Sequence, residues 1–132
     1  MKLYLAGPMR GYHNYNFQQF EDATAYLRWL GHVVVSPHEI DIEQGWVGVK
    51  RGRTLEHAFT DVWTTDTFDF KQAIKRDIRE ITEVDAVAFL PMWKLSQGSQ
   101  IENQVREWCG LPRYLVKPWL YFIMDEQGEV AA

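Results

Sequence analysis

Glu102 lies where a carboxylate could act as a nucleophile or a base. It follows a turn, Ser96–Gly98, and is expected in the first turn of the helix that this turn opens. Free backbone N–H groups and the positive end of the helix dipole would keep its side chain ionised there. An ionised carboxylate in a crevice suits covalent or base chemistry, but a Glu near a helix start can also serve helix stability alone. This segment by itself leaves both interpretations open.

A second carboxylate, Asp77, lies in a helix expected from Phe70 to Val84. Asp77 falls inside the apolar stripe of that helix, whereas its charged neighbours, Arg76 among them, are expected to point away. The stripe consists of Phe70, Ile74, Ile78, Ile81 and Val84. Burial would raise the pKa of Asp77 toward the range of a general acid, unless the carboxylate only bonds a backbone group at a sheet edge. One ionised and one protonated carboxyl in the same crevice form the nucleophile and acid pair that cleaves glycosidic bonds.

Alternating strands and helices must position these carboxylates. Apolar segments that end at Gly, Pro or Ser turns predict strands at residues 2–6, 32–35, 86–90 and 114–116. Helical spacing lies between the first two strands and on both sides of the third. This order predicts one α/β domain over residues 1–132, Rossmann-like or flavodoxin-like, with a mostly parallel five-stranded sheet and helices on both faces. Residues 120–124 are the candidate fifth strand, antiparallel or at the edge because Pro118 precedes them.

Three loops are expected to meet at one edge of this sheet. They follow the first three parallel strands and comprise Gly7–Gly11, Ser36–His38 and Trp93–Gly98. Ligands of open α/β sheets bind at the carboxyl ends of the strands, so the functional residues should gather there.

Residues 45–67 interrupt the alternation of strands and helices. They include three glycines, the cations Lys50, Arg51 and Arg53, and two tryptophans, without a sustained period. Loops of this length in a small domain tend to be lids, binding loops or interface arms. We therefore expect the segment to act at the site or between copies of the chain.

The composition narrows the class of partner. A net charge of −4 disfavours a nucleic-acid polymer, and no apolar run approaches the length of a membrane span. Cys109 is the single cysteine, which excludes an internal disulfide and favours a packing role. A cytoplasmic protein with a small-molecule partner, and with no metal or cofactor, is expected.

Several motifs resemble the nucleoside 2-deoxyribosyltransferase superfamily, over residues 2–42 and 71–116. They are similar above all to its small, often phage-borne branch and to the 2′-deoxynucleoside 5′-monophosphate N-glycosidases. The residues that carry the resemblance are Tyr4–Gly11, Asn16 with Phe20, Gly31–Val34, Arg76–Ile78, Asp85–Val87 and the Ser-x-Gly-x-x-x-Glu run from Ser96 to Glu102. The segment around 45–67 and the C-terminal strand lie outside it.

The resemblance implies roles for three catalytic residues. Glu102 matches the nucleophile that attacks C1′ of the deoxyribose and forms a glycosyl-enzyme ester. Asp77 matches the carboxyl group that protonates the departing base. Tyr4 matches an aromatic hydroxyl near the nucleophile, although a Tyr in a buried strand can also be plain core.

The resemblance also implies where the 5′ end of the substrate lies. Ser96 stands where the nucleoside transferases carry an acidic residue that receives the 5′-hydroxyl, and where the monophosphate hydrolases carry Ser beside the phosphate. A hydroxyl next to the helix N–H groups after Gly98 would bind a phosphate that a carboxylate would repel. The loop formed by Gly7, Pro8, Met9, Arg10 and Gly11 resembles the phosphate loop of the hydrolases, and the alternative for Arg10 is a solvated cation. Trp93 and Met9 could stack on the base.

The expected activity is therefore hydrolysis of the base–deoxyribose bond of a 2′-deoxynucleoside 5′-monophosphate. The alternative within the superfamily is a nucleoside 2-deoxyribosyltransferase that exchanges bases. From another class, a nucleotide-binding protein without turnover stays open. The resemblance also implies a homodimer or a higher homo-oligomer, and action in the cytoplasm, which is the host cytoplasm for a phage-encoded protein.

Overall fold

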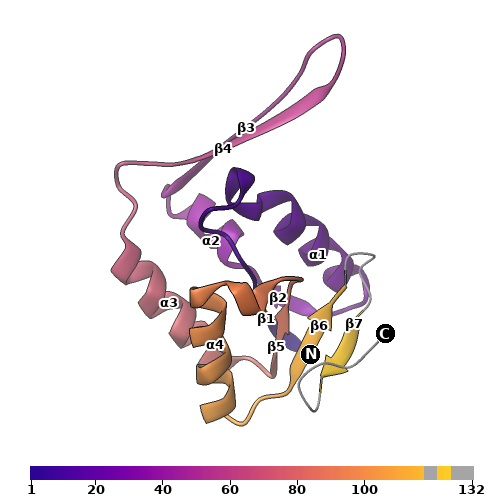
Figure 1. The fold of residues 1–132 in the computed structure, drawn as a ribbon, viewed down its shortest axis with the longest axis vertical. Helices are drawn as coiled ribbons and strands as arrows, with labels where there is room; N and C mark the ends of the chain where they lie inside the picture. The colour runs from indigo at the N-terminus through magenta and orange to yellow at the C-terminus, as the bar shows by residue number, and fades with distance from the viewer. Residues whose placement is uncertain (118–121, 126–132) are drawn as a thin grey trace.

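The computed structural model describes residues 1–117 and 122–125, with thirteen elements of secondary structure (Figure 1). In chain order they are β1 (Lys2–Ala6), η1 (His13–Asn16), α1 (Phe17–Trp29), β2 (Val33–Val35), α2 (Pro37–Glu43), β3 (Val47–Arg53), β4 (Ala58–Thr64), α3 (Phe70–Glu83), β5 (Ala86–Phe89), η2 (Trp93–Leu95), α4 (Gln97–Trp108), β6 (Arg113–Val116) and β7 (Phe122–Asp125). No helix in the part of the chain so described is long and apolar enough to cross a membrane.

The main sheet has the strand order β2-β1-β5-β6-β7. The first four strands run parallel, and β7 pairs antiparallel with β6. The expected α/β class and mostly parallel sheet are thus confirmed: four of the five strands are parallel, and the fifth is an antiparallel strand at the edge. Residues 120 and 121 of the expected fifth strand lie outside the described residues.

Helices cover both faces of the sheet because successive strand residues point to opposite sides (Figure 1). On β1, Leu3 and Leu5 belong to the core cluster under α1, whereas Tyr4 and Ala6 belong to the cluster under α3 and α4. The α1 side also includes Phe20, Ala23, Leu27, Ala88, Leu90 and Val116, and the opposite side Ile81, Val87, Phe89, Trp93 and Leu115. Tyr4 therefore points from the middle of the sheet toward α3 and α4.

Side-chain caps fix where α3 and α4 begin. The carboxylate of Asp69 accepts a hydrogen bond from the backbone N–H of Gln72 (3.1 Å), and the hydroxyl of Ser96 accepts one from that of Ser99 (3.2 Å). These bonds satisfy N–H groups that have no partner within the helix. Because α4 begins at Gln97, Glu102 lies in the second turn of the helix. The position expected from the sequence was the first turn.

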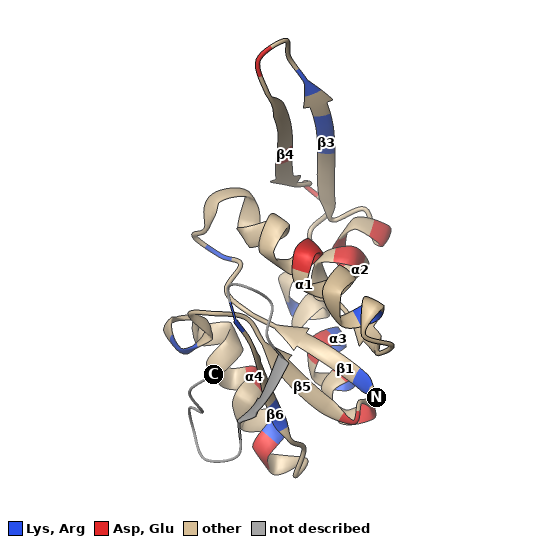
Figure 2. Ribbon diagram, turned by 90° about the vertical axis from the view of Figure 1, so that its right-hand side faces the viewer, with Lys and Arg blue, Asp and Glu red and all other residues tan. Residues whose placement is uncertain are grey.

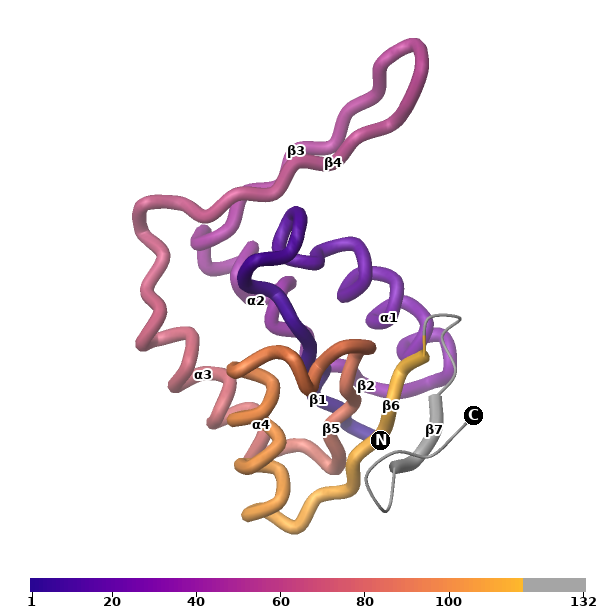
Figure 3. The backbone as a smooth tube through the Cα atoms, in the orientation of Figure 1, coloured from indigo at the N-terminus to yellow at the C-terminus, as the bar shows by residue number. Residues whose placement is uncertain are grey.

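Residues 47–64 form a separate antiparallel hairpin, β3–β4, that projects from the body (Figures 2 and 3). The register runs from Val47 opposite Thr64 to Arg53 opposite Ala58. A Cβ at Gly48 or Gly52 would overlap the ring of Trp63 or Phe59, so each glycine makes room for the aromatic ring across the ribbon. The side chain of Asn14 holds the hairpin to the body by donating to the carbonyl of Thr60 (2.7 Å).

Candidate active site

The hydroxyl of Tyr4, on β1, donates a hydrogen bond to the carboxyl group of Glu102, on α4. Tyr4 has no exposed surface, and Glu102 is partly buried. Burial, and next the charges of Glu102 and Asp77, raise the pKa of Tyr4 well above its ordinary value, so the phenol stays protonated. The fold thus brings Glu102, the predicted nucleophile, into direct contact with Tyr4, its predicted hydroxyl neighbour.

Burial, and next the charge of Asp77, raise the pKa of Glu102 to about 8, although the hydrogen bond of Tyr4 and the charge of Arg76 act to lower it. The sequence predicted the opposite, an ionised carboxylate held by the helix dipole, and this prediction is wrong for the free protein. The dipole acts mainly within the first turn, and Glu102 lies one turn beyond it. Loss of water around the side chain therefore dominates its ionisation.

Asp77 lies on α3 and is the second titratable group of the site. Burial raises its pKa to about 6, while the charge and hydrogen bonds of Arg76 and a hydrogen bond from Tyr4 lower it. The Nε and Nη2 atoms of Arg76 donate to Oδ1 of Asp77 at 3.0 and 2.7 Å. The expected rise of the pKa toward the range of a general acid is present.

Arg76 does not point away from the core, as expected from its helix position. Its side chain is 14% exposed, and its Nη1 atom donates to Oδ1 of the buried Asp41 at 2.6 Å. Arg76 therefore joins α2 to α3 and holds Asp77 in place. Burial raises the pKa of Asp41 although Arg76 lowers it. No local pattern indicated Asp41, because α2 is a short helix whose first residues were expected in the loop Ser36–His38.

The loop after β1 passes close to the loop after β5. A Cβ at Gly7 would lie 2.7 Å from the side chain of Leu90, which explains a glycine at this position. Pro8 is buried, Met9 packs against the core under α1, and Gly11 adopts a left-handed φ of +81°. Met9 is therefore on the other side of the sheet from Tyr4.

Arg10 lies in the loop after β1, and its side chain contacts the first residue of α3. Its guanidinium carbon is 4.1 Å from the ring centroid of Phe70. Phe70 is 47% exposed, and it shares a helix face with Asp77, two turns further along α3. The Arg10 cation is thus on the same side of the molecule as Asp77.

The loop between β5 and α4 contributes Trp93, Ser96 and Gly98. Trp93 is 7% exposed and its ring lies 4.6 Å from that of Phe89, so it packs in the core beneath α4. Ser96 caps α4, and nothing lies within 4 Å of the Cβ position of Gly98 except the hydroxyl of Ser96 at that distance. The start of α4 is therefore open above a packed indole.

Ser99 is a residue of the site that the sequence analysis missed. It is 1% exposed, and its hydroxyl is the one buried side-chain oxygen or nitrogen without a hydrogen-bond partner within residues 1–117. Ser99 precedes Glu102 by three residues and so shares its helix face. That spacing is the signal that could have found it.

The reactive groups of the site are the carboxyl groups of Asp77 and Glu102 and the phenol of Tyr4. Among the described residues, no group of three or more His, Cys, Asp or Glu side chains could hold a metal ion. With the phenol of Tyr4 hydrogen-bonded to Glu102, and with Arg76 on Asp77, the arrangement can hold and move one proton between two acids.

Solved structures share this fold, among them those of two enzymes. A 2-deoxyribosyltransferase from the psychrotolerant bacterium Bacillus psychrosaccharolyticus matches with a TM-score of 0.61 at 20% identity, over 100% of this chain and 77% of that chain. The CMP N-glycosidase BcmB of Clostridium botulinum matches with a TM-score of 0.54 at 18% identity, over 89% of this chain and 71% of that chain. No curated protein matches the sequence. At these identities the likeness establishes the fold, and at that level the predicted resemblance to the deoxyribosyltransferase superfamily is confirmed.

The family follows from the sequence of the domain body. Residues 1–114 match the family described as "Domain of unknown function (DUF4406)". This range extends from β1 into β6 and includes Tyr4, Asp77 and Glu102. The chain therefore belongs to the DUF4406 family, and it shares its fold with the 2-deoxyribosyltransferase and the CMP N-glycosidase.

Proposed function

We propose that this protein is an N-glycosidase that releases the base from a 2′-deoxynucleoside 5′-monophosphate. The observation that carries the proposal is the hydrogen bond from Tyr4 to Glu102 beside a second carboxyl, Asp77, whose pKa is raised. A pair of carboxyls, one acting as nucleophile and one as acid, is the equipment that glycoside cleavage needs. The two enzymes of similar fold are named as a 2-deoxyribosyltransferase and an N-glycosidase, which supports the same class of chemistry here.

In the proposed reaction, a carboxylate oxygen of Glu102 attacks C1′ and the bond from C1′ to the base nitrogen breaks. Asp77 gives its proton to the departing base, so that the base leaves neutral. Water then attacks C1′ of the ester, and Asp77 takes a proton from this water. The products are the free base and deoxyribose 5-phosphate, and both carboxyls return to their starting state.

The proton must first move between the two acids. In the free protein Glu102, with a pKa of about 8, holds its proton at a pH where Asp77, with a pKa of about 6, has lost its own. The reaction needs the reverse distribution. The phenol of Tyr4 donates its one proton to Glu102 and also helps to lower the pKa of Asp77, so its oxygen can accept a proton from Glu102 when its own hydrogen turns toward Asp77. We assign Tyr4 this role in preparing the nucleophile.

A neutral residue at Ser96 favours a substrate with a 5′-phosphate. The Ser96 oxygen accepts from the N–H of Ser99, so its own proton stays available for a phosphate oxygen. Arg10 lies on the Asp77 side of the molecule and supplies the cation. Repulsion of a phosphate, which an acidic residue at position 96 would cause, is absent.

A transferase is the second candidate, because the match to the 2-deoxyribosyltransferase covers this chain completely. In that case a second base, and not water, attacks the ester at C1′. The chemistry up to the ester is the same, so the acceptor separates the two candidates.

Incubation with a panel of deoxynucleotides and deoxynucleosides tests the proposal, with free base measured by chromatography. We expect base release from monophosphates, and none with Glu102→Gln. An added second base should leave the products unchanged for a hydrolase and should yield a new nucleoside for a transferase. Binding of a nucleotide without release of base would instead support a protein that only binds nucleotides.

A further inference from the structure

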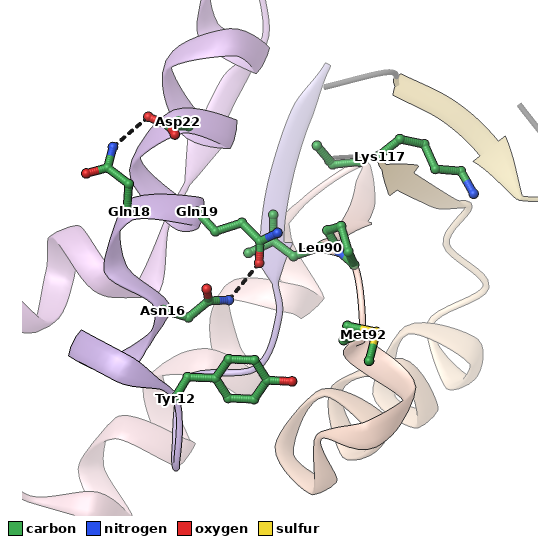
Figure 4. A pocket seen from close by; sticks show the side chains of 10 residues that line it. Tyr12, Asn16, Gln18, Gln19, Asp22, Leu90, Met92 and Lys117 are labelled. Carbon is green, nitrogen blue, oxygen red and sulfur yellow. Dashed lines mark hydrogen bonds between the residues drawn. The ribbon is translucent and has the colours of Figure 1, made fainter. Parts of the chain in front are cut away.

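A cavity of about 540 Å³ opens on the α1 side of the sheet, near the carboxyl ends of β5 and β6 (Figure 4). Its floor is apolar and includes Leu90, Pro91, Met92 and Val116, and its opposite wall comes from the start of α1 and the loop before it. Cavities that bind small ligands in proteins have volumes of about 300–1,000 Å³. The cavity is thus large enough for a molecule of one or two rings.

This cavity is separate from Tyr4, Asp77 and Glu102, none of which lines it. Leu90 and Val116 belong to the core cluster under α1, whereas Tyr4 belongs to the cluster on the opposite face of the sheet. The two regions nevertheless adjoin the same loops. Tyr12 lines the cavity directly after the Gly7–Gly11 loop, and Met92 lines it directly before Trp93.

Hydrogen bonds orient the polar groups of the cavity. The side-chain nitrogen of Asn16 donates to the carbonyl of Pro8 (3.0 Å) and to Oε1 of Gln19 (2.8 Å). Since Gln19 uses its oxygen in this way, its amide nitrogen is left as a donor, and Oδ1 of Asn16 is left as an acceptor. Figure 4 shows the Gln19 amide extending toward Leu90 and the Tyr12 hydroxyl pointing into the gap. Among the described residues, none bonds these three groups.

The two charged residues that line the cavity, Asp22 and Lys117, carry opposite charges, so the lining has no net charge. The side chain of Gln18 donates to Asp22 at 2.8 Å, and both lie on the outer side of α1, away from Leu90 (Figure 4). The ammonium group of Lys117 points away from Gln19 and Tyr12 in the same view. The ligand that fits is therefore neutral, with hydrogen-bond donors and acceptors along one edge and an apolar face.

We propose that this cavity binds a free nucleobase, or the base of a nucleoside, at a site distinct from the one that contains Glu102. Side-chain carboxamides present a donor and an acceptor together, which matches the edge of a base. Tyr12, 40% exposed, and Met92, 57% exposed, supply surfaces that can pack on the faces of a planar ring. The choice of a base among planar heterocycles rests on the proposed function, because the free base is the product of that reaction.

The test uses the intact protein labelled with ¹³C at its methionine methyl groups, with adenine, hypoxanthine, cytosine and thymine as probes. The chain has four methionines, and a Met92→Leu variant identifies the Met92 signal by its loss. We expect one of the bases to shift this signal saturably, because the ring packs on the Met92 side chain. Gln19→Ala should weaken the binding by about 2- to 10-fold, the worth of one hydrogen bond.

Gln18→Ala is the matched control, since Gln18 is next to Gln19 at the outer rim of the cavity, and its side chain bonds only Asp22 among the described residues. It should leave binding unchanged. Thermal melting of each variant shows whether the fold is intact. The proposal is overturned if no base moves the Met92 signal, or if Gln18→Ala weakens binding as much as Gln19→Ala. It is also overturned if Asp77→Asn abolishes the shift, which would place the base in the other site.

These outcomes are independent of base release. A saturable Met92 shift without base release would leave this site in place and overturn the proposed glycosidase. Base release without a Met92 shift would do the reverse.

Discussion

Glu102 and Asp77 cannot both ionise easily at neutral pH, because they share a poorly hydrated region in which Arg76 is the cation that faces them. Arg76 donates directly to Asp77 and not to Glu102, so Asp77 loses its proton first. The pair therefore holds one proton between about pH 6 and pH 8. At the scale of single residues, the free site keeps this proton on Glu102, and substrate binding must shift it to Asp77.

Replacing Glu102 by Gln should abolish base release and stabilise the fold at neutral pH. Below the ordinary pKa of 4.5, Glu102 is protonated in both states and costs nothing. As the pH rises from there toward 8, the unfolded chain loses the proton that the folded chain keeps, which favours unfolding by up to about 1.4 kcal/mol per pH unit. Gln cannot ionise, so its advantage in free energy of unfolding should grow between about pH 5 and pH 8. Denaturant unfolding at both pH values measures this, and an equal difference at both would contradict the raised pKa.

Replacing Asp77 by Asn should reduce activity in a way that depends on the leaving group. A proton donor matters most when the base departs poorly, so the loss should be much larger on a natural nucleotide than on one with an activated base. Base release from the two substrates is compared under single-turnover conditions. Equal losses would assign Asp77 a structural role as the partner of Arg76.

At the scale of elements, the start of α4 combines helix capping with the proposed selection of the 5′ group. Ser96→Asp separates these two roles, because Asp is as good a cap as Ser and would still accept from the N–H of Ser99. The melting temperature should therefore stay close to that of the native protein. The preference for a monophosphate over its nucleoside should invert by repulsion.

Arg10→Ala is the companion variant, and it should reduce the same preference by about one to two decades, the worth of a charge-assisted hydrogen bond of about 1.5–3 kcal/mol. The measurement is the ratio of kcat/KM for a deoxynucleoside 5′-monophosphate and its nucleoside. A native protein that prefers the nucleoside would remove Ser96 and Arg10 from the phosphate role.

The elements of the sheet were predictable because each carries its own pattern. Apolar runs that end at turns predicted β1, β2, β5 and β6. The predicted apolar stripe of α3 is only partly right, because Ile81 and Val84 are buried but Phe70, Ile74 and Ile78 are half-exposed. The hairpin was not predictable, because its regularity lies across the strands. The need for Gly48 and Gly52 is seen only when each is paired with the ring across the ribbon, Trp63 or Phe59.

In the candidate site, too, some features could be predicted from the sequence and others could not. The types of Tyr4, Asp77 and Glu102 were readable from local motifs, but the ionisation of Glu102 depends on its burial. The bond from Arg76 to Asp41 joins residues 35 positions apart, and no local period reports such a contact. Burial and long-range pairing are properties of the packed molecule.

At the scale of the whole molecule, the hairpin β3–β4 is the part that the body does not cover (Figures 1 and 2). Isolated two-stranded ribbons are marginally stable in water. The body holds this one by hydrogen bonds that the Asn14 side chain exchanges with its backbone and by the ion pair of Arg51 with Glu21, while Trp63 stays 46% exposed. We propose that the hairpin is the arm through which two copies of the chain associate.

Removal of the hairpin tests this proposal without disturbing the sheet. The N–H of Thr65 donates to the carbonyl of Trp46 at 2.9 Å, so the two ends of the hairpin lie side by side and a short Gly-Gly turn can join them. The shortened protein should keep its main sheet, because β3 and β4 form a separate sheet, and light scattering should give the mass of a single chain where the native protein gives that of two or more. Circular dichroism serves as the control for folding. A mass per particle that corresponds to the same number of chains before and after the deletion would place the interface on the body, where the half-exposed Phe70, Ile74 and Ile78 of α3 would be the next surface to substitute.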